Sequence, residues 1–455
     1  MRNWLPVDGY RSYKRMTGTG RINASPPVVL AATFLALILA GTILLSLPAA
    51  TNQPISLFTA FFTAASAVTV TGLNIVDPGS TFTVFGQTVL LLLIQIGGLG
   101  FVTFAVVAAL TLGKKISLKQ QALALEAFNQ TSVAKIRRTA FAVLKIALAI
   151  EAMGVLILAL WWWPGSTFGA ALYEAIFYTV SAFNNSGFSL HADSLTRYVG
   201  DPVTVIAISL LVILGGIGFT VISDVAEKRR WATLRPYTKI ILLATLALNL
   251  AGFMAIWALE FNNPKTFAHL PLQAQALAAW LQSVATRTAG FSSVDIAALS
   301  DSTTLIMILL MFIGGGSLST ASGIKIGTFI VLIAAVYSYI FRRPEVVLLK
   351  RSISPDVVQK SLALLLVNST LAFAGVFLIS IFDHVPFLNI LFEVVSALST
   401  TGMGRDLTPQ LSTASQSILI ALMYAGRLGP LTLVYSLATQ RRSRIRYPET
   451  EMQVG

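Results

Sequence analysis

The stretch Val68-Thr69-Val70-Thr71-Gly72-Leu73 sets the organisation of the chain, because it recurs three more times in altered form. Each copy has an alanine five residues before a glycine, polar residues among those between, and an apolar residue after the glycine. One glycine-ended polar segment, used four times in a very apolar chain, predicts four walls of a single site. The four glycines are Gly72, Gly187, Gly290 and Gly402.

The composition indicates a membrane protein. Of the 455 residues, 55% are hydrophobic and only 11% are charged, and the mean hydropathy is +0.76. A soluble domain carries about 25% charged residues, so we expect a polytopic membrane protein. The net charge of +13 does not indicate a nucleic-acid partner, because the basic residues cluster in short segments between apolar runs.

The apolar runs predict an all-α integral membrane fold. Eight runs are long enough to cross a hydrocarbon core of about 30 Å, and four shorter ones between them suit re-entrant helices buried in protein. We therefore expect four tandem repeats of membrane helix, pore helix and membrane helix around one central pore, with eight transmembrane helices and four re-entrant pore loops. The long runs lie near 28–47, 82–112, 139–163, 203–225, 240–259, 305–341, 361–382 and 418–438. The short runs are 57–69, 171–184, 273–286 and 388–399.

The basic residues predict the orientation and the boundaries. The termini and the loops between repeats hold 25 of the 32 lysines and arginines, so both termini and these loops are expected to be cytoplasmic. The short helices then enter the membrane from outside. The predicted divisions are an N-terminal segment at 1–26, repeats at 27–113, 114–228, 229–343 and 344–440, and a C-terminal tail at 441–455.

The four polar segments have the chemistry of a cation filter. Backbone carbonyls can replace the hydration shell of an ion, and glycine reaches the conformations that aim them inward at little cost. A helix C-terminus pointing at the site adds partial negative charge. The alternative is a set of ordinary re-entrant helices with glycine as a C-cap. The candidate ligands are Val70, Thr71, Gly72, Asn185, Ser186, Gly187, Thr288, Ala289, Gly290, Thr400, Thr401 and Gly402.

The run at 305–341 predicts a broken helix. As a single helix it would be about 55 Å long at 1.5 Å per residue, which far exceeds the bilayer. Its glycine- and serine-rich middle is a poor helix former, so an unwound segment in protein or beside a wet cavity is expected. A kinked or tilted helix is the alternative. The candidate residues are Gly314, Gly315, Gly316, Ser317, Ser319, Thr320, Ser322 and Gly323.

The chain resembles the Trk/Ktr/HKT superfamily of potassium transporters, and most closely the KtrB-type membrane subunits of Ktr systems. The resemblance covers almost the whole chain and is carried by Thr286-Arg287-Thr288-Ala289-Gly290-Phe291, Ser399-Thr400-Thr401-Gly402 and Gly314–Gly323. It implies a selectivity filter with one glycine from each repeat and a gate at the intramembrane loop 314–323. The segments lack the second glycine of the Thr-Val-Gly-Tyr-Gly strand of potassium channels, so strict selection of K⁺ over Na⁺ is not predicted.

The resemblance also implies the activity and the partners. It implies a channel-like subunit for potassium uptake across the bacterial inner membrane, with K⁺ as the transported ion and Na⁺ as a candidate activator. The expected assembly is a homodimer, surrounded by membrane lipid, on a cytosolic ring of nucleotide-binding regulatory subunits of the KtrA type. ATP or ADP would then act only through that partner, and no covalent cofactor is expected.

Three basic residues fall within apolar or filter segments, where a charge is costly and usually faces a partner. Arg427 is hypothesised to hydrogen-bond carbonyls of the loop 314–323 and to stabilise its closed state; pairing with Glu393 or another acid is the alternative. Arg287 is expected to point behind the third filter strand and brace it. Lys325 is interpreted as reaching toward the cytoplasmic interface.

Two other function classes share part of this pattern. A secondary symporter that couples K⁺ to Na⁺ or H⁺ by alternating access also uses broken helices and repeats. Against it, the repeats share one orientation, and no acid was expected deep in a span at a proton-relay position. A membrane enzyme is disfavoured, because the chain has no cysteine and its three histidines fall in predicted loops, which leaves Ser317 and Ser319 without a base.

Overall fold

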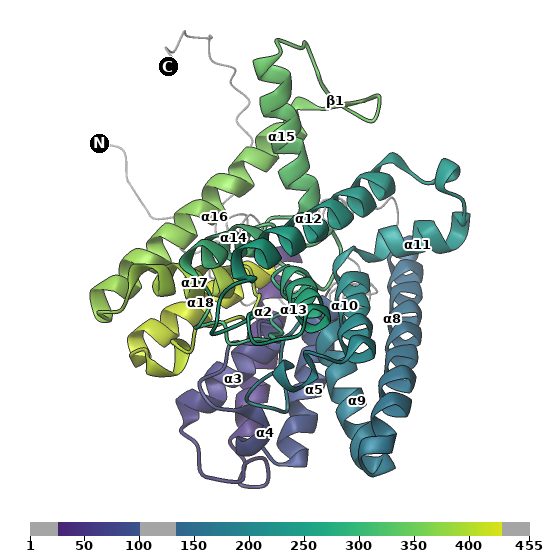
Figure 1. Cartoon of the computed structure of the whole chain (residues 1–455). Helices are drawn as coiled ribbons and strands as arrows, with labels where there is room; N and C mark the ends of the chain where they lie inside the picture. Colours follow the sequence, from purple (N-terminus) through teal and green to yellow (C-terminus); the bar gives the residue numbers. More distant parts are fainter. Residues whose placement is uncertain (1–25, 101–132, 430–455) are drawn as a thin grey trace, which may run out of the picture.

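The structure, a computed structural model, describes residues 26–100 and 133–429. One order of elements recurs four times in it: a long helix, a short helix, a turn with a glycine, and a second helix (Figure 1). The first set is α2 (Pro26–Leu45), α3 (Leu57–Thr69) and α5 (Val84–Gly98). The second is α8 (Val133–Trp162), α9 (Phe168–Phe183), α10 (Pro202–Gly216) and α11 (Phe219–Lys228). The third is α12 (Pro236–Glu260), α13 (Leu272–Ala285), α14 (Asp301–Phe312) and α15 (Ile326–Ile340). The fourth is α16 (Pro355–Phe382), α17 (Phe387–Leu398) and α18 (Thr413–Leu428).

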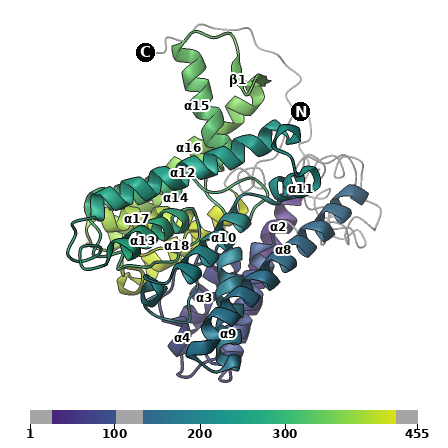
Figure 2. The ribbon, with the colours of Figure 1, turned by 45° about the vertical axis from the view of Figure 1, so that its right-hand side comes forward.

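Minor elements lie between these helices. A hairpin pairs β1 (Val346–Leu348) with β2 (Arg351–Ile353) in antiparallel register. Together with α15 it projects away from the rest of the chain in both views (Figures 1 and 2). This hairpin is the one exception to the expected all-α fold among the described residues. The remaining short elements are α4 (Pro78–Thr81) and 3-10 turns at Trp163–Gly165, Thr196–Tyr198, Trp231–Thr233 and Thr408–Gln410.

The four short helices are the inner elements of a ring. α5 packs against α9, α10 against α13, α14 against α17, and α18 against α3. Each second helix therefore contacts the short helix of the next set, and the last set contacts the first. The hydroxyl of Tyr424 on α18 donates to the carbonyl of Ala31 on α2 at 2.6 Å, which joins the two ends of the described chain.

The short helices begin and end where local sequence chemistry allows. Ser56 and Thr167 cap α3 and α9 by accepting hydrogen bonds from Thr59 N and Ala170 N. α13 and α17 begin after Pro271 and Pro386. All four helices end three to five residues before a filter glycine. The predicted short runs match these helices to within three residues at each end.

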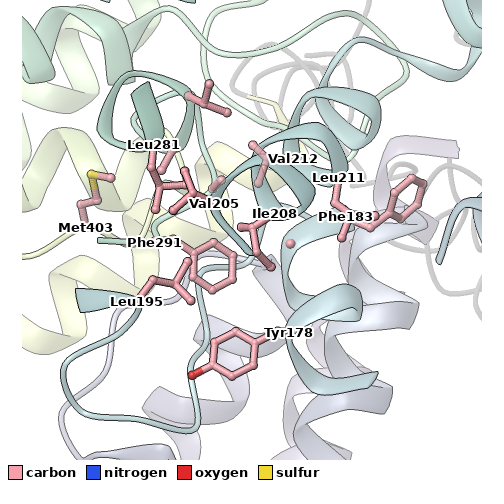
Figure 3. Packing of buried hydrophobic residues seen from close by; sticks show 14 of the residues in the cluster. Tyr178, Phe183, Leu195, Val205, Ile208, Leu211, Val212, Leu281, Phe291 and Met403 are labelled. Atoms are coloured by element: carbon pink, nitrogen blue, oxygen red, sulfur yellow. The ribbon is translucent and has the colours of Figure 1, made fainter. Parts of the chain in front are cut away.

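The residue after each glycine anchors its segment in the apolar core. Leu73, Phe188, Phe291 and Met403 are each at most 2% exposed. Figure 3 shows Phe291 and Met403 in the main hydrophobic cluster. Burying a side chain of this size stabilises a fold by about 1.5–3 kcal/mol, so each filter segment is fixed at its outer end by packing.

The number of spans is defined only in part. Within the described residues, three helical stretches are long and apolar enough to cross a membrane: Phe141–Gly165, Pro236–Glu260 and Pro355–Phe382. Exposed side chains such as Phe373, at 72%, give α16 an apolar outer face. The count of eight spans with four pore loops, and the repeat boundaries, stay predictions. Parts of the runs at 82–112 and 418–438 lie outside the described residues.

The second helices of two repeats differ from simple spans. The run at 305–341 consists of α14 and α15 separated by a non-helical segment, so it is not one kinked helix. The run at 203–225, expected to cross the membrane, is bent, because α10 and α11 meet at an angle of 99°; together the two helices are still long and apolar enough to form one broken span. The bend occurs where Gly218 adopts φ +100° and where Phe219 N donates to Leu318 O, a carbonyl of the other broken segment. A tertiary contact thus ends the helix.

Candidate ion filter and intramembrane loop

The four predicted glycines meet in a closed ring. A β-carbon placed on Gly72 would lie 2.1 Å from the carbonyl oxygen of Ser186, and one on Gly187 would lie 2.8 Å from that of Ala289. One on Gly290 would lie 2.3 Å from the carbonyl oxygen of Thr401, and one on Gly402 only 1.8 Å from that of Thr71. Each glycine therefore faces the carbonyl that precedes the next glycine. Only a residue without a side chain fits such a close approach.

Left-handed backbone occurs twice in every filter segment. The four glycines have φ between +70° and +92°. The residue two positions earlier is also left-handed: Val70, Asn185, Thr288 and Thr400 have φ of 57°, 58°, 72° and 49°. Such a conformation costs about 1–3 kcal/mol in a non-glycine residue and is an outlier for β-branched valine. Left-handed residues at alternate positions let successive carbonyls turn to one side, which a regular strand of L-residues does not allow.

Backbone N–H groups of the filter segments donate hydrogen bonds to the short helix that precedes each segment. In the first repeat, Thr71 N donates to Ser66 O at 2.8 Å and Gly72 N to Ser66 Oγ at 3.0 Å. The fourth repeat uses Ser396 in the same way, at 2.8 Å and 3.1 Å. In contrast, the carbonyls of the two residues before each glycine accept no hydrogen bond from the described residues. Those carbonyls remain available to a cation.

The ring opens into a cavity of about 580 Å³, which we call the outer cavity because the distribution of basic residues predicts that this side faces outward. All four filter glycines line it, and so does one aspartate from each repeat, four to six residues after the glycine. We call Asp77, Asp193, Asp295 and Asp406 the outer aspartates. They are not among the residues predicted from the sequence, although their regular spacing after each glycine is visible there. The side-chain hydrogen bond from Arg197 lowers the pKa of Asp193 below its usual value, which keeps this rim residue charged.

The segment between α14 and α15 folds back on itself. Gly314 N donates to Ile324 O at 2.9 Å and Ile326 N to Gly315 O at 3.0 Å, so the two ends of the loop are bonded to each other. We call residues 314–323 the gate loop, after the role that the family resemblance implies for them. Its ends form a neck with little freedom, because a β-carbon on Gly314 would lie 1.8 Å from Ser322 O.

The body of the gate loop is bonded to the bend between α10 and α11. Gly316 N donates to Gly216 O at 2.7 Å, and Thr320 N donates to Gly215 O at 3.2 Å. From the other side, Phe219 N donates to Leu318 O at 3.0 Å. Three backbone hydrogen bonds therefore join the two broken second helices, a relationship that no local pattern indicated.

Arg427 lies between the gate loop and the first repeat. Its Nη1 donates to Thr320 O and, at 3.3 Å, to Ser322 Oγ. Its Nη2 donates to Gly97 O at 2.5 Å and to Gly98 O at 3.0 Å. The hydrogen bond to the carbonyl of Thr320 agrees with the hypothesised contact between Arg427 and the loop, whereas stabilisation of a closed state stays a prediction.

The alternative partner and the neighbouring lysine are placed differently. Glu393 bonds instead to Arg405 N at 3.1 Å and Thr408 Oγ1 at 2.8 Å. No carboxylate lies within 4.0 Å of the Arg427 guanidinium in the described part of the chain. Lys325 donates to Ala321 O of the gate loop at 2.5 Å, which replaces the expectation that it only reaches toward the interface.

Two further buried charges border the filter. Arg287 points behind the third segment, as expected, and is 7% exposed; it donates to Asn249 Oδ1 and to Gly314 O, both at 3.1 Å. No acid was expected deep in a span at an obvious proton-relay position, but one buried acid does lie within a candidate span. Glu151 lies in the middle of α8, is 6% exposed, and accepts hydrogen bonds from Gln95 Nε2 at 3.0 Å and Asn184 Nδ2 at 3.2 Å. Its position in an apolar run is visible in the sequence.

Comparison with known proteins gives consistent matches. Residues 23–444 match the family model of TrkH, a cation transport protein. The chain is 45% identical over 434 residues to Ktr system potassium uptake protein B of Bacillus subtilis, covering 95% of this chain and 98% of that one. It is 40% identical to the protein of the same name in Vibrio alginolyticus, covering 94% and 95%. The potassium/sodium uptake protein NtpJ of Enterococcus hirae is 31% identical, covering 96% and 98%.

A solved structure shares the fold. The potassium transporter TrkH from Vibrio parahaemolyticus superposes with a TM-score of 0.72. The match covers 93% of this chain and 86% of that one at 19% sequence identity. At this identity the likeness concerns the fold alone. Together with the sequence matches, it indicates a membrane-embedded helical protein.

Proposed function

The chain belongs to the TrkH family of cation transport proteins, and it serves potassium uptake rather than enzymatic catalysis. We propose that it transports potassium as a channel-like translocating subunit. The single observation that carries this proposal is the ring of four glycines, in which the carbonyls between the glycines accept no hydrogen bond from the described residues. Backbone carbonyls arranged in a ring can replace the hydration shell of a cation. The twelve candidate ligands of the four segments form the proposed filter.

The outer cavity supports the choice of a cation. A cleft lined by one sign of charge raises the local concentration of the opposite ion. The outer aspartates come from all four repeats and share the cavity with the filter glycines. Cations would be concentrated there before losing their water, and anions would be repelled.

The gate loop and Arg427 are proposed to hold the pathway closed below the filter. A guanidinium offers five donors in a fixed fork, and here it bridges the loop to the carbonyls of α5. Hydrogen bonds to a charged group contribute about 1.5–3 kcal/mol each, so losing them would shift the loop toward an open position. We expect Arg427→Ala to raise Rb⁺ flux. Arg427→Lys would keep the charge but not the bridge, and should also raise it.

The remaining features are proposed from the relatives. The Ktr system names of two relatives suggest a system of several subunits. We propose a homodimer in the bacterial inner membrane, with both termini cytoplasmic, on a ring of nucleotide-binding subunits of the KtrA type. The E. hirae relative is named for sodium as well as potassium, which supports Na⁺ as an activator.

One observation favours the symporter as a second candidate. Glu151 is a buried acid beside Asn184, the residue that precedes the second filter segment. A carboxylate at such depth can carry protons in transporters. A fixed ratio of K⁺ to H⁺ that is lost in Glu151→Gln would favour coupled transport. A gated pore shows no fixed ratio.

Tracer uptake tests the proposal directly. The purified chain is placed in proteoliposomes, and uptake of Rb⁺ and of Na⁺ is measured under an inside-negative potential. A preference for Rb⁺ that is lost in Gly402→Ser supports the filter. Absent uptake, or equal selection by the variant, contradicts it.

A further inference from the structure

Two of the four filter segments are hydrogen-bonded directly to the gate loop. We infer that Arg287 is a positioning residue that couples ion selection to the position of the gate loop, an inference that rests on the proposed function. Arg287 lies three residues before Gly290, and its Nη2 donates to Gly314 O at the neck of the loop. Its Nη1 donates to Asn249 Oδ1 on α12, so a single buried side chain links the third filter segment, α12 and the loop.

The second filter segment makes an independent link. Thr320 Oγ1 of the gate loop lies 3.2 Å from Phe183 O and 3.2 Å from Asn185 Oδ1. Exchanging the amide atoms of Asn185 preserves the link to Thr320, at 3.2 Å, and adds a bond to Val212 O on α10. Asn185 is two residues before its glycine, so this contact also acts on the filter backbone.

The other repeats show that these contacts are specific. Three residues before the glycine, the first repeat has Thr69, whose hydroxyl bonds locally to Ala65 O at 2.7 Å. The second has Asn184, which bonds to Gln95 and Glu151. The fourth has Ser399, which is 2% exposed and shows no side-chain hydrogen bond to the described part of the loop. The long cationic side chain occurs in the segment that faces the neck.

A role in bracing the third filter segment does not by itself explain why residue 287 carries a charge. A buried guanidinium without a carboxylate partner is costly unless hydrogen bonds satisfy it. Arg287 has no carboxylate within 4.0 Å in the described residues, and its Nε has no acceptor there. Its two remaining acceptors come from different elements, one of them the loop proposed to move. Displacing the loop would leave the charge with Asn249 alone.

This loss would act on the ring of carbonyls. Gly290 faces Thr401 O, and the carbonyl before it faces Gly187. A shift of the third segment therefore changes the spacing to both neighbours. Hydrogen bonds to charged groups fix geometry over a few tenths of an ångström, so the filter would take a different shape when the loop leaves. Opening of the gate would then be accompanied by weaker discrimination between ions.

The test combines two variants of the full chain in proteoliposomes, with uptake of Rb⁺ and Na⁺ as the readout. We expect Arg287→Gln to raise flux and to lower the Rb⁺/Na⁺ preference by about tenfold, the effect of losing one hydrogen bond to a charged group. Arg427→Ala removes a side chain that donates to the gate loop and to α5 but to none of the described filter residues, and it should lower the preference in the same direction. The control Ser399→Ala, at the same register in the fourth repeat, should keep the preference within about twofold.

The double variant separates coupling from local damage. If Arg287 acts through the loop, Arg287→Gln should change the preference by less than about twofold in the Arg427→Ala background, because the loop is already displaced. Full multiplication of the two effects would overturn the inference, as would unchanged selection in Arg427→Ala. If Arg287→Gln does not assemble, Arg287→Lys serves instead, because one ammonium cannot reach both acceptors. Absence of Rb⁺ preference in the wild type would reject the proposed filter itself, which is a separate outcome.

Discussion

Replacing each filter glycine by alanine should damage ion selection in a fixed order, with Gly402 the most sensitive, then Gly72, Gly290 and Gly187. All four positions share the strain of a left-handed backbone, about 1–2 kcal/mol for a residue with a β-carbon. What differs is the space. An added β-carbon would lie 1.8 Å from the facing carbonyl at Gly402 but 2.8 Å at Gly187, whereas ordinary contacts begin near 3.4 Å.

These distances translate into displacements of the ring. The facing carbonyl would have to move by about 1.6 Å at Gly402, from 1.8 to 3.4 Å, but only by about 0.6 Å at Gly187, from 2.8 to 3.4 Å. A shift of 1.6 Å would take the carbonyl oxygen out of contact with an ion in the filter. Gly402→Ala should therefore lose its preference for Rb⁺. For Gly187→Ala we expect only a partial loss of the preference, because the facing carbonyl has to move by the smaller distance.

The assay is the ratio of Rb⁺ to Na⁺ uptake into proteoliposomes, with the amount of folded protein checked by size-exclusion chromatography. Gly200→Ala is the matched control, because nothing lies within 4 Å of a β-carbon there. It should select like the wild type. Equal damage at Gly187 and Gly402, or a reversed order, would refute the reasoning that the carbonyl ring sets selectivity.

Three other predictions concern the gate loop, the outer cavity and pH. Gly316→Ala should raise the basal Rb⁺ flux, because its β-carbon would lie 2.1 Å from the backbone of the α10–α11 bend. Gly216→Ala should not raise it, because the nearest neighbour of its β-carbon is a side chain at 3.3 Å. Equal Rb⁺ fluxes in the two variants would contradict this prediction. Changing any outer aspartate to asparagine should raise the apparent KM for Rb⁺ at low ionic strength, and the difference should shrink near 1 M salt, where the Debye length is about 3 Å. Burial alone raises the pKa of Asp383, but hydrogen bonds from Ser415 and Ser412 lower it below its usual value. The stabilising effect of Asp383 should therefore be complete above the ordinary aspartate pKa of about 3.9 and be lost as the pH falls through the lowered pKa. Equal Tm values for Asp383→Asn and the wild type at pH 7 would contradict this prediction.

Much of the architecture was accessible from the sequence because it depends on local patterns. The short helices follow from apolar runs too short to span, and α3 begins and ends at the predicted residues. The glycine-ended segments stood out because their period is long but regular. The broken third repeat was visible as a run of glycine and serine that cannot remain helical. Membership of the transporter family followed from motifs of the same kind.

Other features could not be read from local sequence. The bend at Gly218 arises from a hydrogen bond between Phe219 N and Leu318 O, residues about a hundred positions apart. Left-handed backbone at Val70 contradicts the preference of a β-branched residue, and only the surrounding packing can impose it. The burial of Glu151 against Gln95 and Asn184 likewise depends on α8, α5 and the C-cap of α9, which are far apart in the sequence.

The sequence by itself determined that the chain lies in a membrane, that it is organised by four polar glycine segments, and that one helix must break. These properties follow from composition, period and helix propensity, which act over a few residues. Only the tertiary structure decided which carbonyl faces which glycine, and which filter segments touch the gate loop. Most of those pairings join residues more than a hundred positions apart, and their geometry depends on how four helix sets close into one ring. No local preference encodes that closure.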